Sequence, residues 1–179
     1  MTILKAVTTK LRPGTPVQAP DWEGIYRAEL PRVLNFFRYR VTDPAAAEDL
    51  AATTFEKAWT ARERYADRGK FSAWLMTIAR NVATDYFRSR RPNLPIEAAG
   101  QQAGDPSPLA AVEAGEELAR LRELLGRLPD HHRELVALKY GAELTNREIA
   151  RQTGMSESNV GSTLFRIVQQ LRLTWEEQR

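Results

Sequence analysis

The stretch from Phe71 to Pro92, FSAWLMTIARNVATDYFRSRRP, combines two kinds of side chain on one predicted helix. Its apolar residues recur at the spacing of a packed helix face, whereas Arg80, Asn81 and Arg88 do not belong in a core. An amide carries both donors and an acceptor, so Asn81 can read the edge of a base while arginines bind phosphates. The stretch therefore indicates a nucleic-acid-binding helix. The alternative is structural, because cations near a helix C-terminus are favoured by its dipole.

The residues just before this helix interleave cations with aromatic rings. Unstacked bases can lie on the rings while phosphates meet the cations, which suits a single strand better than a plain duplex. The residues concerned are Arg62, Arg64, Tyr65, Arg68, Lys70 and Phe71.

A second DNA-binding pattern runs from Leu144 to Arg172. Thr145 can cap a short helix, Gly154 can supply a left-handed turn, and Ser156 can cap a longer helix. This order predicts a helix-turn-helix, whose second helix would read the major groove. A plain helical hairpin with a solvated polar face is the alternative. The residues expected to face outward for DNA are Ser158, Asn159, Ser162, Thr163 and Arg166.

The helix predicted after Thr42-Asp43-Pro44 has the opposite charge. Glu48, Asp49 and Glu56 are mixed with apolar and aromatic residues, including Leu50 and Trp59. Such a surface repels DNA and suits contact with another protein. A solvated charged face over a core stripe is the alternative.

Catalysis is not indicated. His131 and His132 are adjacent, which would point them apart on a helix, and no cysteine or HExxH arrangement accompanies them. Asp85 stands alone among arginines, and Glu48-Asp49 lack a third ligand nearby, so a metal-dependent nuclease is disfavoured. We expect no catalytic residue, no metal and no cofactor.

The composition permits a polyanion as partner. The chain of 179 residues has a net charge of +3, a pI near 9.4, and no cysteine, which favours the reducing cytoplasm. No apolar run approaches the roughly 18 residues of a membrane-spanning helix, so no membrane insertion is expected.

The spacing predicts an all-α protein of two small helical domains. We expect a disordered tail over 1–20, a three-helix-type bundle over 21–91, a flexible linker over 92–112 and a helix-turn-helix domain over 113–176. Pro31 lies inside the first predicted helix, about Asp21 to Arg40, and predicts a kink or a break there.

These segments together resemble a bacterial RNA polymerase sigma factor of the extracytoplasmic-function group. AEDLAATTFEKAW is similar to the group's segment that binds core polymerase, and FSAWLMTIARNVATDYFRSRR to its promoter −10 segment. LPDHHRELVALKYGAELTNREIARQTGMSESNVGSTLFRIVQQLR resembles its −35-reading domain. The three occur in the family's order, with a linker where one is expected.

The resemblance implies a role for each segment: sigma region 2 would bind polymerase and melt the −10 element, and sigma region 4 would meet the −35 element. The implied partners are core RNA polymerase, through the clamp helices of its largest subunit and its beta flap, and promoter DNA as duplex and non-template single strand. Many relatives also have an anti-sigma protein. Contact with polymerase would involve Glu48, Asp49, Leu50, Phe55 and Trp59. Contact with the −10 element would involve Arg62, Arg64, Tyr65, Lys70, Phe71, Arg80, Asn81, Arg88 and Arg91, with Asn81 facing a flipped base.

Two departures from the family pattern affect these expectations. Ala52 and Thr53 stand where Gln and Glu are usual, which removes part of the polar contact to polymerase. Gly161 and Thr163 stand where the recognition helix is often basic, which predicts weaker or different −35 specificity. A stand-alone helix-turn-helix regulator is the alternative function, but it leaves the acidic helix and the Asn81 helix without a role.

Overall fold

The computed structural model describes residues 21–65, 71–90 and 116–177, and every regular element in these ranges is a helix. The predicted tail and linker, Arg68, Lys70 and Arg91 lie outside the described residues, as does the side chain of Arg64. Within the described ranges the predicted all-α class is confirmed.

Helix α1 (Trp22–Arg40) begins where the side chain of Asp21 accepts a hydrogen bond from the amide of Gly24, at 3.0 Å. The sequence predicted a kink or a break at Pro31; a break is wrong, because α1 runs continuously through Pro31. Pro31 and Arg27 are both exposed. Water can therefore satisfy the carbonyl that the missing proline amide leaves without a donor.

Helices α2 (Pro44–Ala61) and α3 (Phe71–Arg90) pack with α1 into the N-terminal unit. Asp43 caps α2 through the amide of Ala45, and Pro44 occupies the first turn, as the sequence predicts. The short 3-10 helix η1 (Arg62–Arg64) follows α2. Leu75, Ala79 and Val82 of α3 are buried, so the predicted apolar face of this helix is confirmed.

The C-terminal unit contains α4 (Glu116–Gly126), α5 (Asp130–Val136), the π-helix η3 (Ala137–Gly141), α6 (Asn146–Thr153) and α7 (Glu157–Glu177). Thr145 and Glu148 form a capping box at α6, and Gly154 ends α6 with a φ of 76°. The hydroxyl of Ser156 accepts from the amide of Asn159 at the start of α7. The predicted helix-turn-helix is therefore confirmed.

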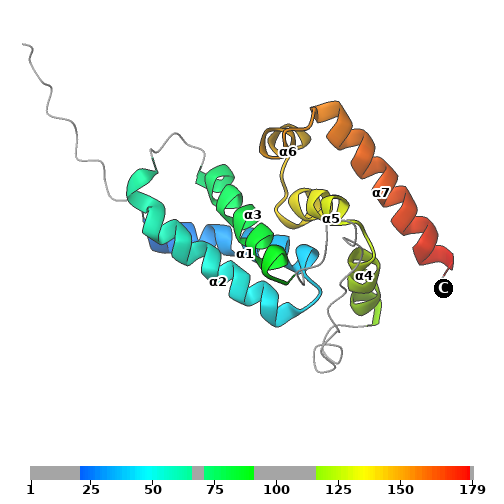
Figure 1. Cartoon of the computed structure of the whole chain (residues 1–179), viewed down its shortest axis with the longest axis horizontal. Helices are drawn as coiled ribbons and strands as arrows, with labels where there is room; N and C mark the ends of the chain where they lie inside the picture. Colours follow the sequence, from blue (N-terminus) through cyan, green and yellow to red (C-terminus); the bar gives the residue numbers. More distant parts are fainter. Residues whose placement is uncertain (1–20, 66–70, 91–115, 178–179) are drawn as a thin grey trace, which may run out of the picture.

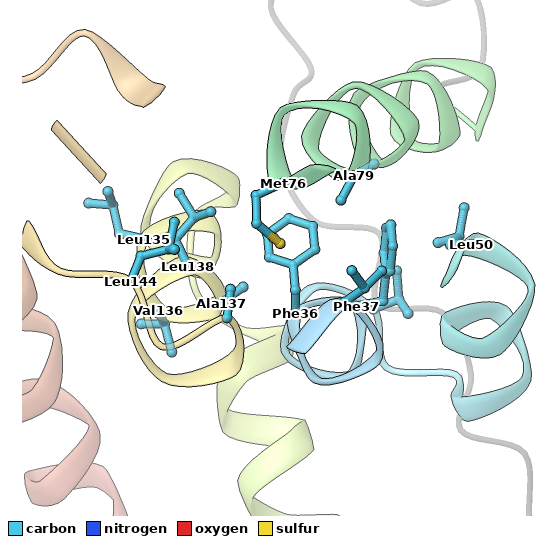
Figure 2. Close-up of a cluster of buried hydrophobic side chains, with 14 of the residues drawn as sticks. Phe36, Phe37, Leu50, Met76, Ala79, Leu135, Val136, Ala137, Leu138 and Leu144 are labelled. Atoms are coloured by element: carbon cyan, nitrogen blue, oxygen red, sulfur yellow. The ribbon is translucent and has the colours of Figure 1, made fainter. Parts of the chain in front are cut away.

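The two units lie side by side, with η3 against α1 (Figure 1). Their buried side chains form one continuous cluster, in which Phe36 and Met76 face Ala137 and Leu138 across the boundary (Figure 2). Gly141 makes the close approach possible, since a Cβ there would lie 2.8 Å from the carbonyl oxygen of Asn35. This shared core is not predicted by the sequence pattern.

Candidate functional sites

An aromatic cluster lies where α1, α2, η1 and α3 meet in the N-terminal unit. Tyr65 packs against both Phe71 and Trp74, with ring centroids 5.4 and 4.8 Å apart. Trp22 joins Phe71 at 5.7 Å and Trp59 at 5.4 Å. The structure thus brings together Tyr65 and Phe71, which the sequence assigned to the −10 element, and Trp59, which it assigned to polymerase.

Arg62 stands at the edge of this cluster. Its guanidinium lies 4.1 Å from the Trp59 ring centroid and donates to the Trp59 carbonyl at 2.8 Å. Tyr65 carries a buried hydroxyl with no hydrogen-bond partner among the described atoms. Rings beside a positioned cation form a surface on which unstacked bases can lie.

The polar residues of α3 divide into two groups. Asn81 and Arg88 are exposed, and Arg88 pairs with Asp85 at 2.7 Å. Arg80 instead points into the boundary between the units, where its Nε donates to Glu134 at 2.8 Å. Its guanidinium also donates to the carbonyl of Gln152. Only part of the predicted cationic face is therefore open to a ligand in this structure.

The acidic residues of α2 face outward over an apolar layer. Glu48 and Asp49 are exposed, whereas Leu50 is buried beneath them. Phe55 is half-buried against Tyr26, with ring centroids 4.6 Å apart, and Trp59 is 50% exposed. This surface offers carboxylates together with accessible aromatic area, which is the composition of a protein-contact site.

The recognition helix α7 presents Ser158, Asn159, Ser162 and Arg166 to solvent. The prediction for Thr163 is wrong: the sequence analysis expected its side chain to face outward, but the residue is only 7% exposed. It lies three residues after Val160 and four before Ile167, so it shares their buried stripe. That spacing was visible in the sequence, and the polarity of the residue misled the prediction.

The buried Thr163 side chain forms hydrogen bonds with two exposed residues of α7, Asn159 and Arg166. Its hydroxyl donates to the Asn159 side chain and accepts from Arg166, both at 3.3 Å. A small hollow beside it is also lined by His132, whose pKa is lowered by burial and by the nearby His131 and Arg166 charges. Thr163 thus positions two candidate DNA-reading side chains.

Gly161 on α7 lies close to the start of α6. A Cβ at this position would lie 3.3 Å from Nδ2 of Asn146, the first residue of α6. An alanine there would require the Asn146 amide to move by a few tenths of an ångström.

Among the described residues, no group of three or more His, Cys, Asp or Glu side chains could hold a metal ion.

Comparison with known proteins gives two matches to family models: sigma-70 region 2 over residues 25–92 and sigma-70 region 4 over residues 118–171. The chain is 34% identical over 152 residues to the ECF RNA polymerase sigma factor SigM of Bacillus subtilis. That alignment covers 83% of this chain and 91% of SigM. The chain belongs to the ECF sigma factors.

A second sequence relative supports this assignment, and a solved structure shares the fold. The ECF sigma factor SigL of Mycobacterium tuberculosis is 34% identical over 149 residues, covering 81% of this chain and 84% of SigL. The sigma factor RpoE of Bartonella quintana, solved in complex with the anti-sigma factor NepR, shares the fold with a TM-score of 0.71. It is 22% identical, and the match covers 89% of this chain and 99% of that one.

This ECF sigma factor is a transcription initiation factor that directs RNA polymerase to promoters. The region 2 match disfavours a stand-alone helix-turn-helix regulator, because such a regulator gives the N-terminal unit no role. Among the described residues, no helix has the length and apolarity required to cross a membrane.

Sequence reasoning missed the residues that join the two units. Arg40 is 3% exposed and pairs with Asp130 at 2.6 Å, while its guanidinium lies over the Phe87 ring. Glu134 and Gln152 of the C-terminal unit accept hydrogen bonds from Arg80 of the N-terminal unit. Each of these residues looks like an ordinary helix-surface polar residue in the sequence, so no local signal identifies its long-range partner.

Proposed function

We propose that this sigma factor divides promoter recognition between α3 and α7 while α2 binds core polymerase. The supporting observation is that the family-matched polar residues lie exposed on three different helices: Glu48 on α2, Asn81 on α3 and Asn159 on α7. Region 2 would read the −10 element, and region 4 would read the −35 element.

At the −10 element, the free energy of binding to the unstacked strand would drive strand opening, and no chemical step would be needed. Tyr65, Phe71 and the neighbouring rings would take up bases that have left the stack, and Asn81 would pair with the edge of an extruded base. Arg62 and Arg88 would hold phosphates of the same strand. Melting then follows because the open strand gains contacts that the duplex cannot make. The protein would act by binding alone, in the cytoplasm, without a cofactor.

At the −35 element, α7 would enter the major groove. Asn159, with its amide, is suited to the donor and acceptor pair of adenine, and Arg166 to guanine or phosphate. Ser158 and Ser162 would add hydrogen bonds to the −35 DNA through their short hydroxyl side chains. Gly161 and the buried Thr163 leave this helix with few cations, so we expect the contact of region 4 with the beta flap of polymerase to supplement its DNA affinity.

At polymerase, α2 would dock on the clamp helices of the largest subunit. Glu48 and Asp49 would supply charge, while Phe55 and Trp59 would supply aromatic area above the buried Leu50. An anti-sigma factor is a further proposed partner, supported by the fold shared with a sigma factor that was solved in such a complex.

The experiment is in vitro transcription from a pool of genomic promoter fragments, using bacterial core polymerase with and without the protein. We expect protein-dependent transcripts whose start regions share spaced −35 and −10 sequences. Tight binding to DNA alone, with no protein-dependent transcript, would overturn the proposal and favour a stand-alone regulator.

A further inference from the structure

We propose that the hollow between α5 and α7 binds a phosphate of the −35 DNA backbone, which Arg166 and His132 contact together. His132 lies on α5, outside the helix-turn-helix of α6 and α7, so it adds a DNA contact that the recognition helix alone does not supply. Its protonation would be coupled to −35 binding. This inference rests on the proposed function of region 4 and deepens it.

The hollow continues the stripe of α7 that carries the proposed reading residues. Asn159, Ser162 and Arg166 are spaced by three and four positions, so they lie on one side of the helix. Gln170 follows Arg166 by four positions and extends the same side. The side chains that line the hollow are His132, Thr163, Arg166, Ile167 and Gln170. The reading face of α7 therefore leads directly into the space beside His132.

The position of the hollow along α7 suits the edge of the major groove. Arg166 follows Asn159 by seven residues, which is about 10 Å along a helix. In a helix-turn-helix the first turns of the recognition helix contact base edges, and the major groove is about 12 Å wide. When Asn159 lies over the bases, Arg166 is therefore near the rim of the groove, where the phosphates pass. The volume of the hollow, about 230 Å³, greatly exceeds the roughly 15 Å³ that one water needs, so it can admit a phosphate.

The lining of the hollow favours a negative charge. None of its described lining residues is acidic, and Arg166 supplies a permanent cation with several N–H donors. The bonds that Arg166 makes within α7 are long, 3.4 Å from Nε to the Ser162 carbonyl and 3.3 Å from Nη2 to the Thr163 hydroxyl. The guanidinium can exchange them for a phosphate, since charge-assisted hydrogen bonds are shorter and stronger.

His132 contributes a ring whose hydrogen bonding is incomplete. Its Nδ1 is buried and has no partner among the described residues. Burial and the nearby His131 and Arg166 charges lower the pKa of His132, so the free protein holds this ring mainly neutral at neutral pH. A half-turn of the ring about its Cβ–Cγ bond fills nearly the same volume, so either edge can present a nitrogen to the hollow. A bound phosphate would supply an acceptor for the protonated ring.

Phosphate binding therefore takes up a proton. The negative charge offsets the field of Arg166 and accepts a hydrogen bond from the protonated ring, so it raises the pKa of His132 above its value in the free protein. Affinity for the −35 element then increases as pH falls from the DNA-bound pKa to the free pKa, and it is constant outside that range.

The elements packed against α5 present further charged groups. Arg40 of α1 pairs with Asp130, the first residue of α5, at 2.6 Å. Lys139 lies two turns beyond His132, in η3. His131 packs against His132 with ring centroids 4.2 Å apart, but it is exposed and does not line the hollow. His131 is thus the matched control, since it is a second imidazole on the same helix outside the proposed site.

The first test compares the promoter affinity of holoenzymes assembled from core polymerase and the full-length protein. Competition binding to a promoter duplex is measured from about pH 8 to about pH 6 for wild type and His132→Gln. We expect the ratio of wild-type to variant affinity to rise about fivefold over this range, because only wild type takes up the proton. His131→Gln should show the same rise over His132→Gln. A ratio that does not change with pH would overturn the proposal.

The second test uses the wild-type holoenzyme alone, so it does not depend on how well a variant folds. One phosphate at a time, along both strands of the −35 element, is replaced by a neutral methylphosphonate. At the contacted phosphate we expect a loss of affinity that is about fivefold larger near pH 6 than near pH 8, because the protonated ring has lost its acceptor. Losses of equal size at both pH values for every phosphate would contradict the proposal, since no backbone phosphate would then be coupled to the ring.

Failure of this inference is distinguishable from failure of the proposed function. Scrambling the −35 sequence should weaken binding by the holoenzyme both with wild type and with His132→Gln. Binding that depends on the −35 sequence, together with a pH-independent ratio, would reject only the phosphate site. Binding that ignores the −35 sequence while the pH-dependent ratio persists would reject the proposed reading by region 4 and leave the phosphate contact standing.

Discussion

Helices α3 and α7 are the two proposed reading helices, and they differ in how free their polar faces are. On α7 the amide of Asn159 and the guanidinium of Arg166 are exposed, and their hydrogen bonds with Thr163 stay within the helix. On α3 the exposed Asn81 is next in sequence to Arg80, which the other unit holds. Residues of similar type therefore differ in availability because of what packs beside them. The polar side chains of the proposed −35 surface are exposed, whereas Arg80 of the proposed −10 surface is bonded to the C-terminal unit.

The largest expected effect comes from the core that supports both helices. Phe36→Ala should lower the free energy of unfolding by about 3–5 kcal/mol, since Phe36 is fully buried between the units. Urea denaturation, followed by far-ultraviolet circular dichroism, measures the change. Phe165→Ala on α7 is the control, because Phe165 is 65% exposed and should cost little. If urea unfolded the protein in two separate transitions and Phe36→Ala shifted only one of them, α3 and α7 would not share one core.

The next effect separates what the two helices read. Asn81→Ala should lose about 1–3 kcal/mol of discrimination at the −10 element and none at the −35 element. Asn159→Ala should do the reverse, so each variant serves as the control for the other. Competition transcription between matched and mismatched promoters measures both, with polymerase binding checked separately. If either variant affected both elements equally, the division of reading between α3 and α7 would be wrong.

A smaller effect tests the correction at Thr163. Thr163→Ala should cost about 1 kcal/mol of stability, because the variant removes a buried hydroxyl that bonds Asn159 and Arg166. Arg166→Ala, in contrast, should weaken −35 binding with little change in stability, since Arg166 is exposed. Thermal unfolding and −35 competition distinguish the two. A direct base contact by Thr163 would instead appear as altered preference at one base pair without loss of stability.

The smallest expected effect is a pH dependence of the stability that Glu148 contributes within the helix-turn-helix. Hydrogen bonds from the Thr145 amide and hydroxyl lower the pKa of Glu148. A lowered folded-state pKa stabilises the protein above the unfolded-state value, and the contribution is lost as pH falls through the folded pKa. Wild type should therefore be more stable than Glu148→Gln at neutral pH, and the difference should vanish in acid. A difference that stayed constant with pH would show that the charge of Glu148 contributes nothing.

The sequence predicted what local rules determine. Asp43, Thr145 and Gly154 each match a cap or turn that neighbouring residues dictate, and the structure confirms all three. The first helix was predicted over nearly its full length, and only the possible break at Pro31 was wrong, because water can reach the Arg27 carbonyl that the proline leaves without a donor. Thr163 was misplaced because polarity outweighed its helical register. The boundary between the units was missed because Arg40 and Asp130 are 90 residues apart in sequence, and no periodicity links them. The roles of the site residues stay predictions.

The aromatic cluster also gives the molecule an optical property. The chain has four tryptophans, and three of them, Trp22, Trp59 and Trp74, lie in or beside that cluster, while Trp175 lies on α7 under the guanidinium of Arg120. Most tryptophans of the protein therefore lie in the aromatic cluster that also contains Tyr65 and Phe71 of the proposed −10 surface. Bases stacking on those rings would quench their fluorescence, so emission intensity would follow strand opening in real time without an attached dye.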